Sequence, residues 1–458
     1  MDMRALRLRI RGDVVIRDDA DYEAVRAGLV WNGRKPDRFP EIIVKAKDAG
    51  DVQAAVRFAA AHGKRVCVRG GGHHWSGLAV QDGIVIDLAA MDALVIDPEA
   101  RTARAEPGMR NGRLTEALAE HGLAFPAGHC ASVPLSGYLL GGGFGWNSGA
   151  WGVACHNVES VEVVLADGSL VTASVAENTD IFWAARGAGP EFFGVVVAYR
   201  LRLHPLPQAI RTSLWTYRPD RGEAVEDWMN RTMRQVPRTV EFTAVMASAP
   251  PPLASQAEKT LTAVATIFAD TEEEAQETLA TIKAGAPEGA LDVQLSLPTS
   301  FAVLYQIIGQ FFPEGRRFAA DTNWSDDPAM LMKRLTEAVE IAPSAESFAL
   351  AVVLPPLDPD LMPPGAFSMV GPVFSCAYAV WQEASQDDAN LAWLRNASDR
   401  LAPVSLGHYV GEADLDRAER IRGSFSPAAF ERLRELRRRF DPAGRFHRLA
   451  AQPLRKTG

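Results

Sequence analysis

The residues of this chain best placed to do chemistry are histidine and cysteine side chains in glycine-rich loops. His73 and His74 directly follow the three glycines at 70–72, and Cys130 lies in a second glycine-rich stretch over residues 128–152. Loops of this composition leave their side chains accessible, so we expect the His73 imidazole to be exposed beside a bound ligand. Unpaired loop amides can also stabilise a thiolate, which would make Cys130 a nucleophile, with inert packing as its alternative.

Three glycine clusters predict a binding site for a large phosphorylated ligand. They lie at residues 69–83, 128–152 and 186–196. Because glycine has no Cβ, the backbone amides of such loops can close around phosphate oxygens, and a dinucleotide is the ligand we expect. The first cluster runs into an apolar strand at 84–88 instead of a helix, which disfavours a Rossmann nicotinamide site. Tight turns are the alternative explanation for any single cluster.

Composition excludes several classes of protein. The 458 residues are 47% hydrophobic and 23% charged, which is typical of a globular chain of two or three domains. The 48 basic residues against 57 acidic ones give a net charge of −9, so nucleic acid is not an expected ligand. Four cysteines are too few for a disulfide framework, and no ligand spacing for zinc is present, so we expect no metal.

No stretch of the chain resembles a targeting or membrane-spanning segment. The opening sequence MDMRALRLRIRGD mixes charges every few residues and lacks the apolar run of a signal peptide. Later stretches do not reach the length of uninterrupted apolar sequence that a membrane helix needs. We therefore expect a cytoplasmic protein without membrane contact; its oligomeric state is not specified by the sequence.

The expected secondary structure places the glycine loops at the ends of strands. A strand at 41–46, a helix from Asp51 to about His62 and a strand at 65–68 form a βαβ-like unit, in which Asp51 caps the helix. Two apolar runs around an Ala-Asp-Gly turn predict a hairpin over 158–174. The first glycine cluster thus begins at a strand's carboxyl end.

A change of texture divides the chain into three segments. Prolines punctuate the sequence near residue 207, and residues 208–405 then alternate strand-like and helical stretches, which predicts an α+β domain with a mostly antiparallel sheet. Residues 406–458 include a helix that Ser426 and Pro427 open. We expect 1–207 and 406–458 to form one discontinuous domain and 208–405 to form a second, substrate-binding domain.

The motifs together resemble one family of flavoproteins. The chain is similar to the berberine bridge enzyme-like proteins of the vanillyl-alcohol oxidase superfamily, which have a p-cresol methylhydroxylase-type FAD-binding fold. The resemblance rests on VRGGGH with Gly77 following, GHCASV, LSGYLLGGGFG, GVACHNV, ADG, RGAGPEFFGVV, YVGEAD and FDPAGRF. It implies an α+β, two-domain flavoprotein whose discontinuous FAD-binding domain is combined with a substrate domain of antiparallel sheet and helices.

The resemblance also implies a doubly attached FAD. In the family, the residues at the positions of His73 and Cys130 are bonded to the flavin 8α-methyl carbon and to C6, so this chain resembles the bicovalent members. Val133 matches the position that lines the oxygen-accessible face in oxidases, and Tyr138 matches a residue beside the flavin pyrimidine. The FAD-binding positions implied are His73, Cys130, Arg69, Gly70, Gly71, Gly72, Gly77, Leu78, Val133, Gly137, Tyr138, Gly141, Gly142, Gly143, Gly145, Asn157, Gly194 and Val195.

Tyr409 is the catalytic base that the resemblance implies, since many relatives use a tyrosine in a Y-x-N segment. If residues 409–414 are extended, Tyr409 and Gly411 share one face, and Glu412 and Asp414 share the other. A tyrosine needs a lowered pKa to act as a base at neutral pH, and either carboxylate could replace it. Gly411 stands where relatives usually have asparagine.

The expected activity is oxidation of a small molecule. We expect a hydride to pass from an alcohol, a hemiacetal or an amine to FAD, with reoxidation by O2 to H2O2. A dehydrogenase with another electron acceptor and a non-catalytic flavin-binding protein are the alternatives. Aromatic residues of the middle domain could line a substrate cleft, although such residues are more often core; they are Tyr305, Phe311, Phe312, Trp324, Tyr378 and Trp381.

Overall fold

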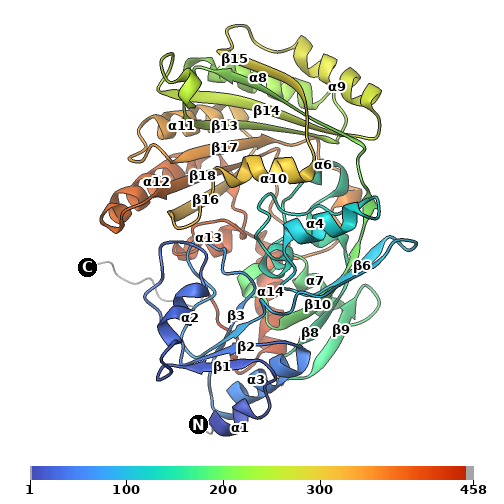
Figure 1. Cartoon of the computed structure of the whole chain (residues 1–458), viewed down its shortest axis with the longest axis vertical. Coiled ribbons are helices and arrows are strands. Elements are labelled where there is room, and N and C mark those ends of the chain that lie inside the picture. Colours follow the sequence, from blue (N-terminus) through green and yellow to red (C-terminus); the bar gives the residue numbers. More distant parts are fainter. Residues whose placement is uncertain (1–2, 450–458) are drawn as a thin grey trace.

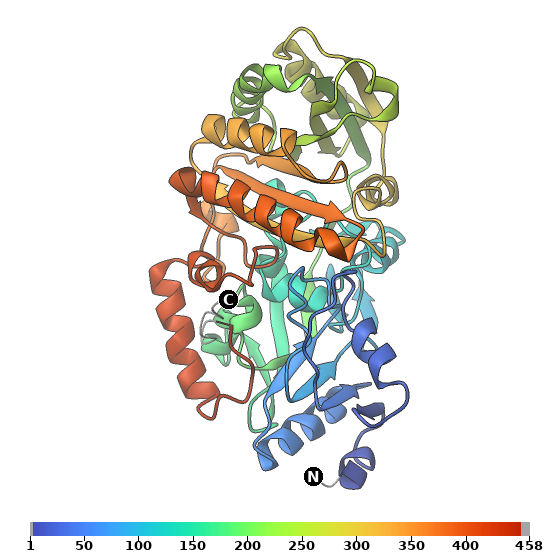
Figure 2. The ribbon, with the colours of Figure 1, turned by 90° about the vertical axis from the view of Figure 1, so that its left-hand side faces the viewer.

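The computed structural model describes residues 3–449, which form two stacked halves (Figure 1). The lower half in this view holds the N-terminal strands, and the upper half is built on an eight-stranded sheet. The side view in Figure 2 shows helix α14 (Pro427–Phe440) running back along the lower half. The chain therefore passes from the lower half to the upper half and returns.

A four-stranded sheet carries the first glycine loop. Strands β2 and β3 both run parallel to β4, which lies between them, so the expected βαβ-like unit is present with one strand inserted. The sheet has the order β1 (Asp13–Ile16), β2 (Ile42–Lys45), β4 (Ile84–Asp87) and β3 (Val66–Arg69). Its helices are α1 (Met3–Arg7), α2 (Tyr22–Gly28) and α3 (Ala49–Ala61).

Helix α3 starts before the expected position, and Asp51 does not cap it. The cap is Asp48, whose carboxylate accepts from the amide of Asp51 at 3.0 Å. The Asp51 carboxylate accepts instead from the amides of Arg11, Gly12 and Lys47. The sequence offered two acceptors three residues apart, and the N-terminal segment that packs here decides between them.

A five-stranded sheet carries the other two glycine clusters. The predicted hairpin over 158–174 is confirmed by the antiparallel pairing of β8 with β9. The sheet has the order β5 (Leu94–Asp97), β6 (Thr102–Ala105), β10 (Val195–Arg202), β8 (Val158–Val164) and β9 (Leu170–Ser174). The remaining elements of this part are α4 (Asn111–Ala119), β7 (Leu123–Ala124), α5 (Leu135–Leu140), α6 (Ser148–Trp151), α7 (Thr179–Ala185) and β11 (His204–Pro205).

The upper half is an antiparallel sheet with helices, as predicted for the middle of the chain. The sheet has the order β15 (Asp292–Pro298), β12 (Ala209–Tyr217), β14 (Lys259–Ala269), β13 (Val240–Ser248), β17 (Phe348–Val353), β18 (Val373–Trp381), β16 (Arg317–Ser325) and β19 (Ser405–Gly407). Its helices are α8 (Gly222–Met233), α9 (Glu272–Ala284), α10 (Phe301–Gly309), α11 (Pro328–Glu340) and α12 (Asp387–Leu401).

One face of this sheet packs into the core of the upper half, and the other face lines a cavity. In β13 the side chains of Val240, Phe242 and Ala244 join the core that α8 and α11 cover. The intervening residues Glu241 and Thr243 point to the opposite face, which lines a cavity. The period of two in a strand therefore separates the core of the upper half from the wall of the site.

The C-terminal segment closes the lower half. Ser426 caps α14 as predicted, Leu433 and Leu436 of this helix are buried, and α13 (Ala418–Gly423) precedes it. The buried Arg437 guanidinium donates to the carbonyls of Glu191 and Phe446 at 3.0 and 2.6 Å. It thereby fixes the end of the described chain against the third glycine cluster.

None of the helices within residues 3–449 has the length and apolar composition needed to cross a membrane.

Candidate functional site

A cavity of about 1290 Å³ lies between the two halves. Its lining combines the glycine-rich loops of the lower half with the cavity face of the eight-stranded sheet. Ligand pockets usually measure roughly 300–1,000 Å³. The space therefore suffices for a ligand larger than a single small molecule.

The first glycine loop is shaped by Arg69. Its guanidinium donates to the carbonyls of Gly70 and Gly71 at 3.3 and 2.9 Å and to Leu29 O at 3.1 Å. A carboxylate oxygen of Asp87 accepts from the same group at 3.0 Å. Arg69 itself does not line the cavity, so its role is to hold the loop's carbonyls.

The glycines permit close packing of this loop. A Cβ on Gly70 would lie 2.3 Å from Ser136 Cβ, and one on Gly71 would lie 2.3 Å from Pro134 Cδ. Gly72 has a φ of +65°, and its Cβ would lie 1.8 Å from Leu29 O. Gly70 and Gly71 therefore let the first loop pack against the second, and Gly72 lets it pack against Leu29.

His73 lines the cavity and is half-buried, which differs from the exposed side chain that we expected. It stacks on Trp31 with ring centroids 5.3 Å apart, and a hydrogen bond joins it to the backbone of Ser132 in the second loop. Burial, with the nearby positive charge of Arg69, lowers the pKa of His73 to about 4. The imidazole is thus neutral at neutral pH and retains a nucleophilic nitrogen.

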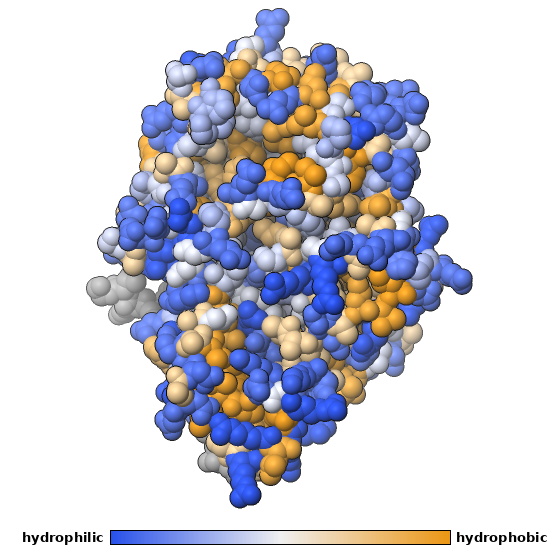
Figure 3. All heavy atoms as spheres, in the orientation of Figure 1, coloured by the Kyte–Doolittle hydropathy of each residue, from blue (hydrophilic) through white to orange (hydrophobic). Residues whose placement is uncertain are grey.

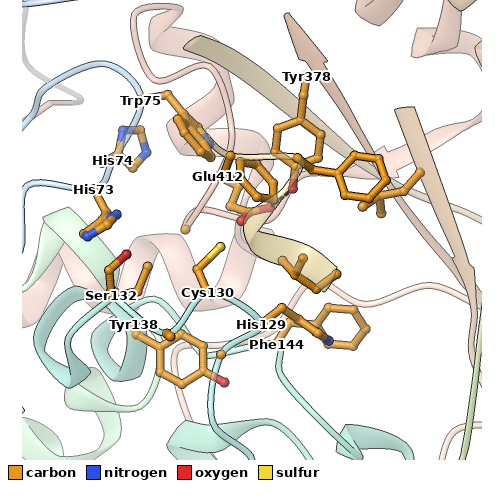
Figure 4. Close-up of a pocket in the computed structure, with 18 of the residues that line it drawn as sticks. His73, His74, Trp75, His129, Cys130, Ser132, Tyr138, Phe144, Tyr378 and Glu412 are labelled. Carbon is orange, nitrogen blue, oxygen red and sulfur yellow. Dashed lines mark hydrogen bonds between the residues drawn. The ribbon is translucent and has the colours of Figure 1, made fainter. Parts of the chain in front are cut away.

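Cys130 faces the same space as His73 from the second loop (Figure 4). Burial raises the pKa of its thiol to about 12, and the charge of Glu412 adds to the rise. The environment thus differs from the thiolate-stabilising loop expected from the sequence, because desolvation outweighs any stabilisation by amides. The cavity brings the two predicted attachment residues together.

The segment after β19 is a turn, and the extended arrangement expected for residues 409–414 is wrong. The amides of Glu412 and Ala413 both donate to Tyr409 O, at 3.1 and 3.0 Å. A Cβ on Gly411 would lie 2.6 Å from Tyr409 Cζ, which explains the glycine at this position. The turn brings Tyr409 and Glu412 to the same cavity, where an extended segment would have separated them.

The Tyr409 hydroxyl is hydrogen-bonded to the backbone of the lower half. It accepts from the amides of Gly143 and Phe144 at 3.1 and 3.4 Å. Burial nevertheless raises the pKa of Tyr409, and the charge of Glu412 raises it further. The two amide hydrogen bonds oppose this rise without outweighing it, so the net direction of the pKa shift disfavours proton acceptance by this phenol.

Glu412 is a carboxyl group held at the cavity wall. The hydroxyl of Tyr378, from β18, donates to Glu412 Oε2 at 3.0 Å, which Figure 4 shows as a dashed line. Burial raises the pKa of Glu412, although the hydrogen bond from Tyr378 and the charge of His129 oppose the rise. A fixed carboxyl with a raised pKa is the kind of group that accepts protons in enzymes.

A buried carboxylate ties the Glu412 turn to the sheet. Asp321 of β16 accepts from the amide of Asp414 at 3.0 Å and from the Arg420 Nε at 2.8 Å. Its side chain is only 1% exposed, and Ser398 of α12 donates to it as well. Asp321 therefore links the turn at Asp414 to Arg420 and to Ser398 of α12.

Tyr138 lines the cavity, but its hydroxyl donates to Pro126 O at 2.6 Å. This local partner corresponds to a tyrosine packed between loops more than to a donor toward a ligand. Other predicted binding residues that line the cavity are Gly70, Gly71, Gly72, Leu78, Val133, Gly137, Gly141 and Gly194. Those that do not are Arg69, Gly77, Gly142, Gly143, Gly145, Asn157 and Val195.

For two of the predicted binding residues, the structure explains why they do not line the cavity. Val195 is fully buried in the core of the lower half. Asn157 donates to Trp151 O and Val153 O, and its carbonyl accepts from Arg202 and His204. Both side chains therefore hold the structure behind the cavity.

The aromatic candidates divide between cavity and core. Tyr305, Phe311, Phe312 and Tyr378 line the cavity. Trp324 and Trp381 are each 1% exposed and belong to the packed interior. Sequence reasoning missed Trp31, Trp75, His129 and Glu241, which also line the cavity. For Trp75 and His129 a signal was available, because each directly adjoins a residue that the motifs singled out.

Comparison with known proteins identifies the family. Residues 40–174 match the FAD binding domain model. The FAD-linked oxidoreductase nodO of Hypoxylon pulicicidum is 31% identical over 430 residues, which cover 93% of this chain and 94% of the relative. The chain belongs to the FAD-linked oxidoreductases.

Solved structures of berberine bridge enzyme-like proteins have the same fold. Berberine bridge enzyme from Eschscholzia californica aligns with a TM-score of 0.80 at 21% identity, over 98% of each chain. The 6-hydroxy-D-nicotine oxidase of Arthrobacter nicotinovorans aligns with a TM-score of 0.83 at 22% identity, over 96% of this chain and 97% of that one. The predicted two-domain α+β flavoprotein fold is confirmed.

The cavity fits the FAD that the FAD-linked oxidoreductases bind. Gly137 lines it, and a Cβ there would meet no atom within 4 Å, so open space lies in front of the second glycine loop. None of the described lining residues is a lysine or an arginine. The FAD phosphates must therefore be balanced by backbone amides of the glycine loops, which suit this purpose.

We predict that Gly72→Ala strongly reduces the FAD content of the purified protein, since its Cβ would collide with Leu29 O. The matched control is Gly63→Ala, because Gly63 has the same φ of +65° but nothing within 4 Å. The control should lose only about 1–2 kcal/mol of stability from left-handed strain. Flavin absorbance per chain and thermal unfolding measure both effects; equal losses in the two variants would contradict the packing argument.

Proposed function

We propose that this protein is an oxidase with FAD bonded to His73 and Cys130, which oxidises an alcohol, a hemiacetal or an amine and passes the electrons to O2. The observation that carries the proposal is the convergence of His73, Cys130 and Glu412 on one cavity. FAD, when bound, supplies the acceptor for the hydride and the donor for reduction of O2 to H2O2. The similar 6-hydroxy-D-nicotine oxidase is named as an oxidase, which agrees with this chemistry.

His73 is the preferred attachment site of the two neighbouring histidines. Burial lowers the pKa of both imidazoles to about 4, so both are neutral at neutral pH. The His73 ring is oriented by its stacking on Trp31, while His74 Nδ1 accepts from the amide of Ser76 at 3.3 Å. Cys130 faces the cavity from a separate loop, so the two bonds would fix different edges of the flavin. A ligand held in this way can leave the substrate side of the cavity wide.

The covalent proposal predicts that acid-precipitated protein stays yellow. The intact mass of the denatured chain should exceed the sequence mass by one FAD less two hydrogens for each bond formed. His73→Ala and Cys130→Ala should each retain one bond, and the double variant should release its flavin. A bare-chain mass from protein produced with ample riboflavin would refute covalent attachment.

We further propose that Glu412, in preference to Tyr409, takes the proton from the substrate's hydroxyl or amine. Burial and the charge of Glu412 raise the pKa of Tyr409 despite the two amides that donate to its hydroxyl. The Glu412 carboxylate is fixed by hydrogen bonds from the Tyr378 hydroxyl, at 3.0 Å, and from the Cys376 thiol. A carboxylate has room for further donors, so a substrate hydroxyl or amine can bind to it. Tyr378 positions the carboxylate for this contact.

Glu412→Gln should slow flavin reduction by roughly 10²-fold or more, since a positioned base contributes about that much. Because the pKa of Glu412 lies above its ordinary value of 4.5, the wild-type rate should fall as pH drops through that raised pKa, where the carboxylate is protonated. Stopped-flow reduction across pH measures both effects. If Tyr409→Phe is slower than Glu412→Gln and removes the pH dependence, Tyr409 is the base.

Reaction with oxygen is assigned to the side of the cavity that Val133 lines. Its side chain is small, which leaves access for O2, and its carbonyl accepts from Asn111 N at 2.9 Å, so the residue is fixed in place. The alternative is a dehydrogenase that uses another electron acceptor.

We expect the anaerobically reduced protein to reoxidise rapidly when mixed with O2 and to release H2O2. Val133→Ile should slow this step by at least about tenfold, equivalent to ~1.4 kcal/mol in the barrier, without changing the rate of flavin reduction. Stopped-flow absorbance and a peroxide assay provide the measurements. Slow wild-type reoxidation with fast reduction by an artificial acceptor would favour the dehydrogenase.

A further inference from the structure

Apart from its histidines, the cavity wall carries ionisable acidic side chains but no basic ones among the described residues. Glu241, Asp292 and Glu412 line the cavity, and the described lining residues include no lysine or arginine. Arg69 lies behind the first glycine loop, where its guanidinium is used by Asp87 and by backbone carbonyls. A cavity with apolar walls whose charged groups are carboxylates concentrates cations and repels anions.

Glu241 is a fixed carboxylate that still has capacity for a ligand. It projects from β13 to the cavity face, and its side chain is 15% exposed. One oxygen accepts from the amide of Asn147, and the other lies 3.6 Å from His129 Nε2. Two carboxylate oxygens offer about four acceptor positions, so a bound cation could still find partners here.

Aromatic rings form much of the remaining wall. Trp75 stacks on Phe312 at 6.0 Å, Phe312 meets Tyr378 edge to face at 5.3 Å, and the Tyr378 hydroxyl leads to Glu412. Ring faces attract organic cations as well as hydrocarbon. A molecule that combines rings with one positive charge would match both features.

Five of the seven threonines that line the cavity pair their hydroxyls with one another and therefore offer little to a sugar. Thr212 contacts Thr266 and Thr299 at 3.3 and 3.1 Å, and Thr216 contacts Thr262 at 3.1 Å. Apolar residues also border the opening: Leu297 of β15 and Ile307 of α10 line the cavity and are 37% and 40% exposed. Figure 3 shows hydrophobic side chains gathered in the upper half of this face.

We infer that the substrate of this cavity is an apolar amine that binds as its cation, with Glu241 and Glu412 as counter-ions. The inference rests on the proposed function, since it names the substrate class of the same site. Alcohols of equal size bind without the electrostatic contribution, and carboxylates are excluded by repulsion from the wall.

Three probes with one hydrocarbon frame test the inference on the FAD-loaded protein: 2-phenylethylamine, 2-phenylethanol and phenylacetate. Affinities come from calorimetry and from the shift of the flavin absorbance. The amine should bind at least about tenfold more tightly than the alcohol, or ~1.4 kcal/mol, and phenylacetate most weakly. Equal affinities for the three probes would overturn the inference.

Variants locate the charge that produces the preference. Glu241→Gln should reduce the advantage of the amine while leaving the affinity for the alcohol unchanged, and Glu241→Asp should retain much of it. Glu346→Gln is the control for loss of one negative charge, because Glu346 lies on the surface beside Arg316. A preference that survives unchanged in Glu241→Gln would refute the role of Glu241, and Glu241→Asp gives the answer if the amide variant does not fold.

Binding and oxidation then give separable outcomes. Selective amine binding without flavin reduction by any substrate would support the inference and refute the proposed oxidase activity. Flavin reduction by alcohols that bind as tightly as amines would support the oxidase and overturn the inference.

Discussion

The contact between the first two glycine loops is the constraint on which the site depends. Gly70 and Gly71 lie so close to Ser136 and Pro134 that no Cβ fits between them. Since that contact fixes the separation of the loops, it also fixes the relative positions of His73 and Cys130, which project from them. The hydrogen bond from His73 to the backbone of Ser132 belongs to the same junction. Pro134 is part of this packing, because its ring lies where a Cβ on Gly71 would be.

The cavity has two chemically different sides. The lower half presents glycine loops with backbone amides, while the upper half presents carboxylates, rings and threonines on alternate positions of its strands. The glycine loops of the lower half therefore suit a phosphorylated cofactor, and the carboxylates and rings of the upper half suit an amine. Burial acts on both sides: it keeps His73 neutral, and it makes the Cys130 thiol and the Glu412 carboxyl harder to ionise.

Local patterns allowed much of this structure to be predicted. The glycine clusters, the hairpin over 158–174 and the helix opened by Ser426 depend on neighbouring residues, and they appear where the sequence indicates them. The 409–414 turn could not be predicted in this way. Its alternating residues suit a strand, but Asp321, which lies 93 positions before Asp414, stabilises the turn. Long-range partners likewise decided the cap of α3.

Glu241 shows the same limit for the site. In the sequence it is an acidic residue at an alternate strand position, which is typical of a solvent-exposed face. Only the placement of the lower half over that face turns it into a cavity residue. The partner of the Tyr409 hydroxyl was hidden for the same reason, because residues 143 and 144 lie in the other half.

The anchoring of the Glu412 turn by Asp321 has a consequence for chimeric proteins. Glu412 lies in the C-terminal segment, yet β16, α12 and Arg420 hold its turn through one buried carboxylate. The position of the turn is therefore fixed by contacts with the upper half. A chimera that takes the eight-stranded sheet from a relative would therefore also need residues 408–420 from that relative. A junction at residue 405 would separate the Asp321 carboxylate from Asp414 and Arg420, which it binds.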